Sequence, residues 1–284
     1  MRRFIASFPI LAVLALTPMA FADRDVVAET FKPYSQMLDR HLTEKDLDND
    51  GLVSAFDYRA ALDDTDTGTL LERQRAILAE FDIDTLDTRE QAVAFWLNAY
   101  NFFMIAHILE ERPGGELIDS VWDYGGRLNP FRANIFERDL FDIGGKKYSL
   151  DGIEKGILLG DAYKEKGWKE ARVHFSVNCA SVGCPPLRAA IFTADNVDDV
   201  MTENARRAFN TDRHLRVDGD TLYLTELFDW YESHYVNEKG SVREFIQAYA
   251  EDHVAEKVAA THRIRFIDYD WALNSPENFP EFNE

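Results

Sequence analysis

Cysteine and positive charge are scarce in this chain. Two of the 284 residues are cysteine, and Asp and Glu total 51 against 31 Lys and Arg, for a formal charge of −20. Such an excess of negative charge repels the phosphates of nucleic acids and anionic lipids, which argues against both as partners. It is compatible with cationic ligands, with metal ions or with a solvated acidic surface.

Long apolar runs are also missing, except at the start of the chain. Residues 1–22 begin with two arginines, continue with an apolar stretch over residues 8–16 and close with Ala20-Phe21-Ala22, a small-x-small cleavage pattern. The stretch is shorter than the about 20 residues of a membrane span, and no cysteine follows the cleavage site to carry a lipid. We therefore expect a cleaved signal peptide, a protein in the periplasm or secreted, and no membrane insertion after cleavage. No later segment is expected to cross a bilayer.

Roughly 260 residues remain after cleavage, which suits one large domain. We expect an N-terminal helical region over 23–87 and a main domain over 88–284, forming one structural unit. Apolar spacing predicts helices over 31–42, 69–81, 88–111, 150–159, 197–209 and 242–249, and strands over 173–177, 214–217, 221–224 and 263–267. This pattern predicts a compact α+β domain with a small mixed or antiparallel sheet and many helices. It is compatible with a papain-like, cysteine-hydrolase-like fold.

Both cysteines lie in residues 173–188, VHFSVNCASVGCPPLR. Alternating apolar residues predict a short strand at the start of this segment, ended by a turn at Gly183 and Pro185-Pro186. Cysteines of exported proteins usually pair, and Cys179 and Cys184 can form a disulfide if their Cα atoms lie within about 7 Å. A structural disulfide, a reactive thiol and a redox-active bridge are the three interpretations that this segment leaves open.

Five sequence blocks occur in order along the chain. They are FWLNAYN (95–101), SLDGIEKGIL (149–158), VHFSVNC with CPPLR (173–188), LFDWY (227–231) and IDYDWALN (267–274). Together they resemble the family of bacterial and plant proteins called domain of unknown function 547, over residues 37–274. The family implies no particular reaction. The chain departs from its pattern at Lys155 and Leu159, where the family has His and Arg, and at His234, where an acidic residue is more usual.

The resemblance implies a thiol site. By position in the blocks, Cys179 is the nucleophile, His174 its acid/base and Glu154 the carboxylate that orients the histidine, with Asn178 as a substrate or oxyanion contact. Residues five apart on a strand point to opposite faces, so the chain is expected to bend between Asn178 and Cys179. These residues predict a cysteine-dependent hydrolase or acyl transferase that acts on a peptide or a peptide-like small molecule and needs no catalytic cofactor. The alternative is a noncatalytic binding or scaffold module with a disulfide and a calcium loop.

Residues 46–57, DLDNDGLVSAFD, fit the twelve-residue calcium loop of EF-hands. The expected ligands, at positions 1, 3, 5, 7 and 12, are Asp46, Asp48, Asp50, the carbonyl of Leu52, and Asp57. A helix through Lys45 is expected to lead into the loop. Asp at position 12 is one methylene shorter than the usual Glu, which predicts weak Ca²⁺ binding or tolerance of Mg²⁺. Chance clustering of carboxylates in an acidic chain is the alternative.

Two further groups of residues have structural interpretations. Asn98 and Asn101 lie on an apolar helix, where buried amides need partners, and we expect hydrogen bonds to loops rather than substrate binding. His107 on the same helix is expected to be a core residue. Trp230, Tyr231, Asp270 and Trp271 either pack in the core or line a peptide-sized cleft.

Overall fold

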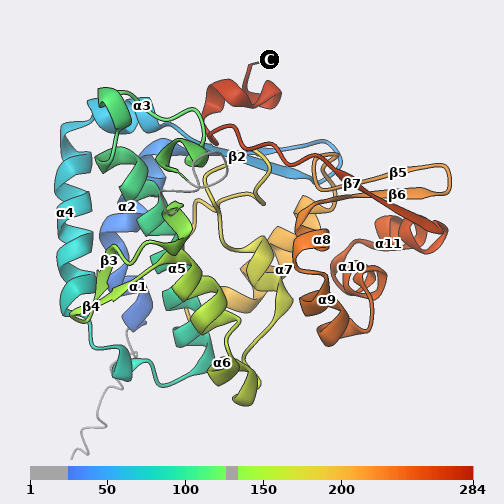
Figure 1. The fold of residues 1–284 in the computed structure, drawn as a ribbon, viewed down its shortest axis with the longest axis horizontal. Helices are drawn as coiled ribbons and strands as arrows, with labels where there is room; N and C mark the ends of the chain where they lie inside the picture. The colour runs from blue at the N-terminus through green and yellow to red at the C-terminus, as the bar shows by residue number, and fades with distance from the viewer. Residues whose placement is uncertain (1–24, 126–133, 284) are drawn as a thin grey trace, which may run out of the picture.

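The computed structural model describes residues 25–125 and 134–283, which form a compact α+β fold (Figure 1). The predicted signal peptide, residues 1–22, lies outside the described residues. The helices are α1 (Val26–Thr30), α2 (Lys32–His41), α3 (Tyr58–Asp63), α4 (Thr65–Glu80), α5 (Arg89–Glu110), α6 (Asp161–Glu165), α7 (Val197–Ala208), α8 (Leu227–Trp230), α9 (Glu232–Lys239), α10 (Val242–Tyr249) and α11 (Asp252–Ala259). The strands are β1 (Leu42–Asp46), β2 (Leu52–Phe56), β3 (Phe141–Ile143), β4 (Lys146–Tyr148), β5 (Leu215–Asp218), β6 (Thr221–Thr225) and β7 (Arg263–Ile267).

Helix α5 is the central helix of the larger hydrophobic core. Its start is fixed by a capping box, in which the Thr88 hydroxyl accepts from the backbone N–H of Gln91 and the Gln91 side chain accepts from that of Thr88. Every residue from Ala92 to Leu109 is buried, and the helix contacts α1, α3 and α7. By length and composition α5 could cross a membrane, contrary to the expectation that no later segment could, but its apolar stretch is entirely buried inside the protein. It is therefore the core helix of this fold.

The sheets are small and follow one another along the chain. β1 pairs with β2 and β3 with β4 as antiparallel hairpins, and β6 pairs antiparallel with β5 and parallel with β7. Gly219 makes the β5–β6 turn with φ +55°, which glycine adopts without strain. Figure 1 shows this sheet beside α10 and α11, away from α1, α2 and α4. A second hydrophobic core fills this part of the molecule, built around Phe175, Phe228 and Phe245.

Most predicted elements are present. α2, α4, α5, α7, α10 and the strands β5 to β7 fall where the apolar spacing places them, within a few residues. Two predictions were wrong. The helix expected to continue through Lys45 ends at His41, and Lys45 lies in strand β1, because this segment pairs with β2. Residues expected to form a strand from Val173 instead form the 3-10 helix η6 (Ala171–Phe175).

The C-terminal segment after β7 passes back through the middle of the fold. The backbone N–H groups of Val182 and Gly183 donate to the carbonyls of Ala272 and Asp270, at 2.9 and 2.8 Å. The N–H of Phe56 donates to the carbonyl of Asn274 at 3.0 Å. The segment therefore holds the loop that carries both cysteines against the rest of the protein.

Candidate functional site

A cavity of about 320 Å³ lies where the cysteine loop, the 3-10 helix η6, helix α8 and the C-terminal segment meet. It is lined by residues from all five sequence blocks. The lining residues are Tyr100, Trp122, Asn134, Phe136, Glu137, Asp151, Glu154, Lys155, His174, Val177, Cys179, Cys184, Pro185, Leu227, Trp230, Tyr231, Tyr269 and Trp271. Three of the predicted site residues, Cys179, His174 and Glu154, are thus brought to one cavity.

Glu154 and His174 form a buried hydrogen-bonded pair, with Oε1 and Nδ1 3.2 Å apart. Glu154 lies on a helical segment with π-helical geometry over Gly152–Leu158, and the Ser149 hydroxyl accepts from the N–H of Gly152 at its start. Ser149 thus caps the start of this helical segment. An ionised carboxylate only accepts hydrogen bonds, so Nδ1 of His174 carries the proton and a neutral ring presents a lone pair at Nε2.

The other side of His174 is occupied by His234 on α9. Nε2 of His174 and Nδ1 of His234 are 2.8 Å apart, and Tyr231 stacks on the His174 ring at 3.9 Å between centroids. Burial lowers the pKa of His234 to about 4, with smaller contributions from His174 when that ring is protonated and from the charge of Lys169. A neutral His234 therefore donates from Nδ1 to Nε2 of His174. In this conformation Nε2 of His174 is engaged by His234.

The two cysteines are joined by a disulfide, with sulfurs 2.16 Å and Cα atoms 6.2 Å apart. The Tyr269 hydroxyl lies 3.2 Å from the sulfur of Cys179 and 3.1 Å from that of Cys184, and it donates because disulfide sulfurs carry no proton. The backbone N–H of Cys179 also donates to the Cys184 sulfur, at 2.9 Å. Of the two, Cys184 is buried and Cys179 is partly exposed in the cavity.

Asn178, the predicted substrate contact, lies outside this cavity lining. Its side-chain Nδ2 donates to the carbonyl of Pro185 at 2.9 Å, and its Oδ1 accepts from the N–H of Ala180 and from Nδ2 of Asn274. The chain does bend here, because Ala180 has φ +59°. Asn178 in this conformation holds the bend in place from inside the protein.

The amides on α5 bind loops, as expected. Asn98 exchanges two hydrogen bonds with the backbone of Phe192, at 2.7 and 3.0 Å. Asn101 donates to the carbonyl of Ser176 and accepts from the N–H of Asn178. Both side chains therefore position the segments on either side of the cysteine loop.

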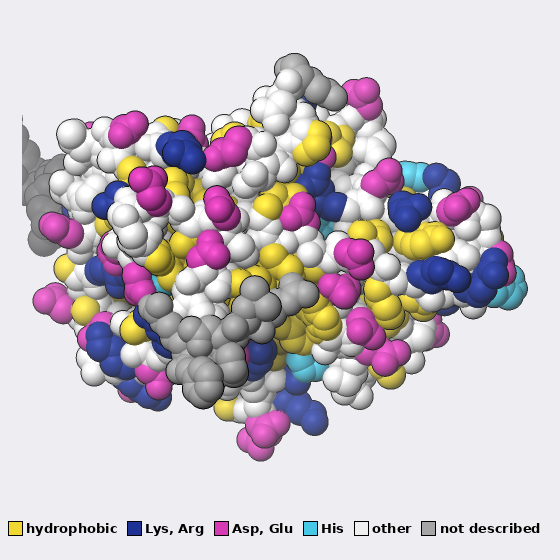
Figure 2. Space-filling view, turned by 45° about the horizontal axis from the view of Figure 1, so that its top comes forward, with side chains coloured by type: hydrophobic (Ala, Val, Ile, Leu, Met, Phe, Trp, Pro, Cys, Tyr) yellow, Lys and Arg dark blue, Asp and Glu magenta, His cyan; other side chains and the backbone are white. Residues whose placement is uncertain are grey.

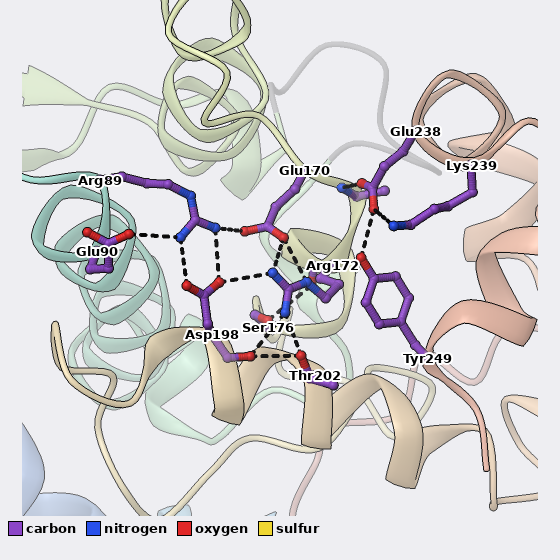
Figure 3. A network of polar contacts seen from close by, with 11 residues as sticks. Arg89, Glu90, Glu170, Arg172, Ser176, Asp198, Thr202, Glu238, Lys239 and Tyr249 are labelled. Atoms are coloured by element: carbon purple, nitrogen blue, oxygen red, sulfur yellow. Dashed lines mark hydrogen bonds and ion pairs between the residues drawn. The ribbon is translucent and has the colours of Figure 1, made fainter.

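The segment with η6 is held by a group of ions that the sequence did not single out (Figure 3). Asp198 on α7 accepts from Arg89 at 2.9 Å and from Arg172 at 3.0 Å, and Glu170 bridges the same two arginines. Helix α9 is tied to η6 as well, because the Glu238 carboxylate accepts from the N–H of Ala171. Most of these contacts join residues that are far apart in sequence, so no local motif predicts them.

The predicted calcium loop forms the turn of a β-hairpin. Asp46 pairs with Arg207 and Asp50 with Arg206, while the Asp57 side chain caps α3 by accepting from the N–H of Ala60. Asp48 is exposed and Leu52 is fully buried in β2. Among the residues that the structure describes, no three His, Cys, Asp or Glu side chains are grouped to hold a metal ion. The five expected ligands are not gathered in this conformation, and calcium binding stays a prediction.

The fold and the cavity define a class of protein: an α+β domain with an aromatic cavity that contains a histidine–carboxylate pair and a disulfide. Residues 83–209 match the model of the family described as Protein of unknown function, DUF547, which supports the resemblance of the chain to that family. Three of the five sequence blocks lie within the match, while LFDWY and IDYDWALN lie beyond it. No curated protein and no solved structure matches the chain.

Proposed function

We propose that the protein is an exported, cysteine-dependent hydrolase or acyl transferase that acts on peptide-like amides when its disulfide is reduced. Cys179 is the nucleophile, His174 the acid/base and Glu154 the carboxylate that orients it, in a cysteine-hydrolase-like architecture. The observation that carries the proposal is the buried Glu154–His174 hydrogen bond in the same cavity as a partly exposed Cys179. A carboxylate that fixes one ring nitrogen and a thiol near the other are the parts of a nucleophile–base pair.

The chemistry requires two changes from the conformation described. Two equivalents of a small thiol reduce the disulfide to two thiols and leave as their own disulfide. His234 must also turn away, so that Nε2 of His174 can take the proton of the Cys179 thiol. The thiolate then attacks the amide carbon, and His174 returns the proton to the departing amine. Water or an acceptor amine attacks the resulting thioester, which restores the Cys179 thiol.

The second candidate is a noncatalytic binding or scaffold module. It is favoured by the disulfide, which leaves no free thiol, and by the hydrogen bond that engages Nε2 of His174 with His234. The missing family His and Arg at Lys155 and Leu159 point the same way. In this interpretation the cavity binds a ligand without turning it over.

Thiol reactivity after mild reduction separates the two. At pH 6.5 an ordinary thiol is only about 1% thiolate, so a cysteine activated by imidazole reacts at least about tenfold faster with iodoacetamide. Peptide mass mapping should find Cys179 modified first. His174→Ala should remove the advantage, and Glu154→Gln should reduce it less because Glu154 acts through the imidazole.

Two matched variants complete the experiment. Cys184→Ser exposes Cys179 without any reductant, and Cys179→Ser does the same for Cys184. If Cys179 and Cys184 are labelled equally slowly, and His174→Ala changes neither rate, the result would favour the noncatalytic binding module. The intact mass of protein from the periplasm, with and without an alkylator, reports which oxidation state occurs there.

A further inference from the structure

Four aromatic side chains form one side of the cavity. Trp271 is in the centre, with ring centroids 4.5 Å from Tyr269, 4.9 Å from Trp122 and 5.7 Å from Trp230. The rings of Trp230 and Trp271 are stacked, and Trp230 is 43% exposed despite its size. On the face shown in Figure 2, hydrophobic side chains gather in the middle of the view, with Asp and Glu side chains around them.

The charges on the cavity lining are mainly negative. Glu137, Asp151 and Glu154 line it, and among the residues that the structure describes Lys155 is the one Lys or Arg on the lining. Its charge is balanced locally, because its ammonium pairs with Asp151 at 2.9 Å. Burial, followed by the charges of Glu154 and Asp151, raises the pKa of Tyr231, as expected where the surroundings disfavour a further negative charge.

We propose that this cavity binds the ammonium group of a peptide-like ligand, held against Trp230, Tyr269 and Trp271. The inference rests on the proposed function for the peptide-like part of the ligand and adds the charge that the site selects. The face of an aromatic ring attracts a cation through its quadrupole, most strongly for tryptophan, and nearby carboxylates add to the attraction. The same carboxylates repel a ligand carboxylate, and the formal charge of −20 acts in the same direction at longer range.

The ammonium can come from a lysine-like side chain or from a free peptide N-terminus, and three small probes distinguish these sources. N-acetyl-L-lysine methylamide carries a side-chain ammonium, L-norleucine methylamide an α-ammonium, and N-acetyl-L-norleucine methylamide no charge. Titration calorimetry with the disulfide-bonded protein at low salt should show at least one ammonium probe binding about tenfold or more tightly than the neutral probe. The tighter of the two identifies the source. Equal binding of all three probes would overturn the proposal. A fourth probe, N-acetyl-L-norleucine, carries a carboxylate, and tighter binding of this anion would also overturn the proposal.

Variants tie the preference to the aromatic residues. Trp230→Leu keeps an apolar side chain but removes the π-face, and should reduce the preference for ammonium to less than about threefold. Phe266→Leu is the matched control, because Phe266 is an exposed aromatic residue on β7 that does not line the cavity. Asp151→Asn should weaken binding of the ammonium probes while leaving the neutral probe unchanged. A preference that survives both cavity variants places the ammonium elsewhere and overturns the proposal.

The binding experiment is independent of catalysis. It uses the oxidised protein, in which Cys179 cannot act as a nucleophile, so a protein without thiol reactivity can still show the ammonium preference. An ammonium preference without thiol reactivity would support the ammonium site and reject the hydrolase. Thiol reactivity without an ammonium preference would support the hydrolase and reject the ammonium site.

Discussion

At the scale of single residues, a chain of hydrogen bonds runs from Glu154 through His174 to His234. Each member is at least partly buried, and the two imidazoles are stacked parallel, with centroids 5.1 Å apart. Protonation of His234 would add a positive charge to this largely buried pair of rings, and burial is the main cause that lowers the pKa of His234. The stability of the arrangement therefore depends on a neutral His234.

This dependence makes stability sensitive to pH. The folded-state pKa of His234, about 4, is below the ordinary value near 6.5, so only the unfolded chain takes up this proton as the pH falls between them. The contribution of His234 to the free energy of unfolding is complete above pH 6.5 and is lost as the pH falls through the folded-state pKa. Between pH 7 and pH 5 the free energy of unfolding should fall in both proteins. In His234→Gln it should fall by about 1 kcal/mol less than in the native protein, as measured by urea unfolding.

His253→Gln is the control for this prediction. His253 is exposed on α11. The free energy of unfolding of His253→Gln should show the same pH dependence as that of the native protein. If His234→Gln also loses as much stability as the native protein, His234 is not the titrating group.

The sequence predicted part of the site at this scale. The family blocks identify Cys179, His174 and Glu154, and all three line the cavity. The role of His234 could not be predicted, because it depends on how α9 packs against η6 across 60 residues of sequence. For Asn178 the sequence indicates a polar group beside the thiol, but not that its amide is directed inward to Pro185 and Asn274.

At the scale of elements, the cysteine loop depends on a close approach to the C-terminal segment. A Cβ atom at Gly183 would lie 3.0 Å from both the backbone N and O of Asp270 and 3.0 Å from the Tyr269 ring. Backbone atoms cannot move aside independently as a flexible side chain can. The absence of a side chain at Gly183 is therefore a condition for the contact.

Gly183→Ala should destabilise the protein by about 1–3 kcal/mol, because overpacking against a fixed backbone forces the loop outward. Its control is Gly68→Ala in α4, where a Cβ would meet nothing within 4 Å. That substitution should stabilise the protein by about 0.5–1 kcal/mol through higher helix propensity. Thermal unfolding of both variants checks the pair, and equal melting temperatures would show that the loop is not tightly held.

Helices were easier to predict than the segment around His174. Apolar spacing predicted α2 and α7 and the strands β5 and β6, because it is a local signal. The segment Ala171–Phe175 is buried at every residue, so its alternating pattern carries no information about a solvent face. The β1–β2 pairing likewise overrode the helical pattern that runs on to Leu42.

At the scale of the whole molecule, the net negative charge is compatible with calcium binding. In the conformation described, Arg206 and Arg207 neutralise Asp50 and Asp46, and Ca²⁺ would have to displace both arginines. With Asp at position 12, such a site would be weak.

Ten millimolar Ca²⁺ should raise the melting temperature by about 3–6 °C, which corresponds to about 1.4 kcal/mol when the ion is about tenfold above its Kd. Asp46→Ala combined with Asp50→Ala should abolish the shift, whatever it does to the starting temperature. Asp218→Ala, on the exposed end of another hairpin, should leave the shift intact. If all three proteins melt alike with calcium and with a chelator, the loop is only an acidic turn.

The passage of the C-terminal segment through the middle of the fold has a consequence for the order of events during synthesis. Tyr269 and Trp271 complete the cavity and contact residues that are made about 90 positions earlier, such as Cys179. A nascent chain emerging from the ribosome thus has no finished cavity until the segment after β7 has been made. If the predicted signal peptide directs export, the last step of assembly takes place on the far side of the membrane, in the oxidising compartment where the cysteines can pair.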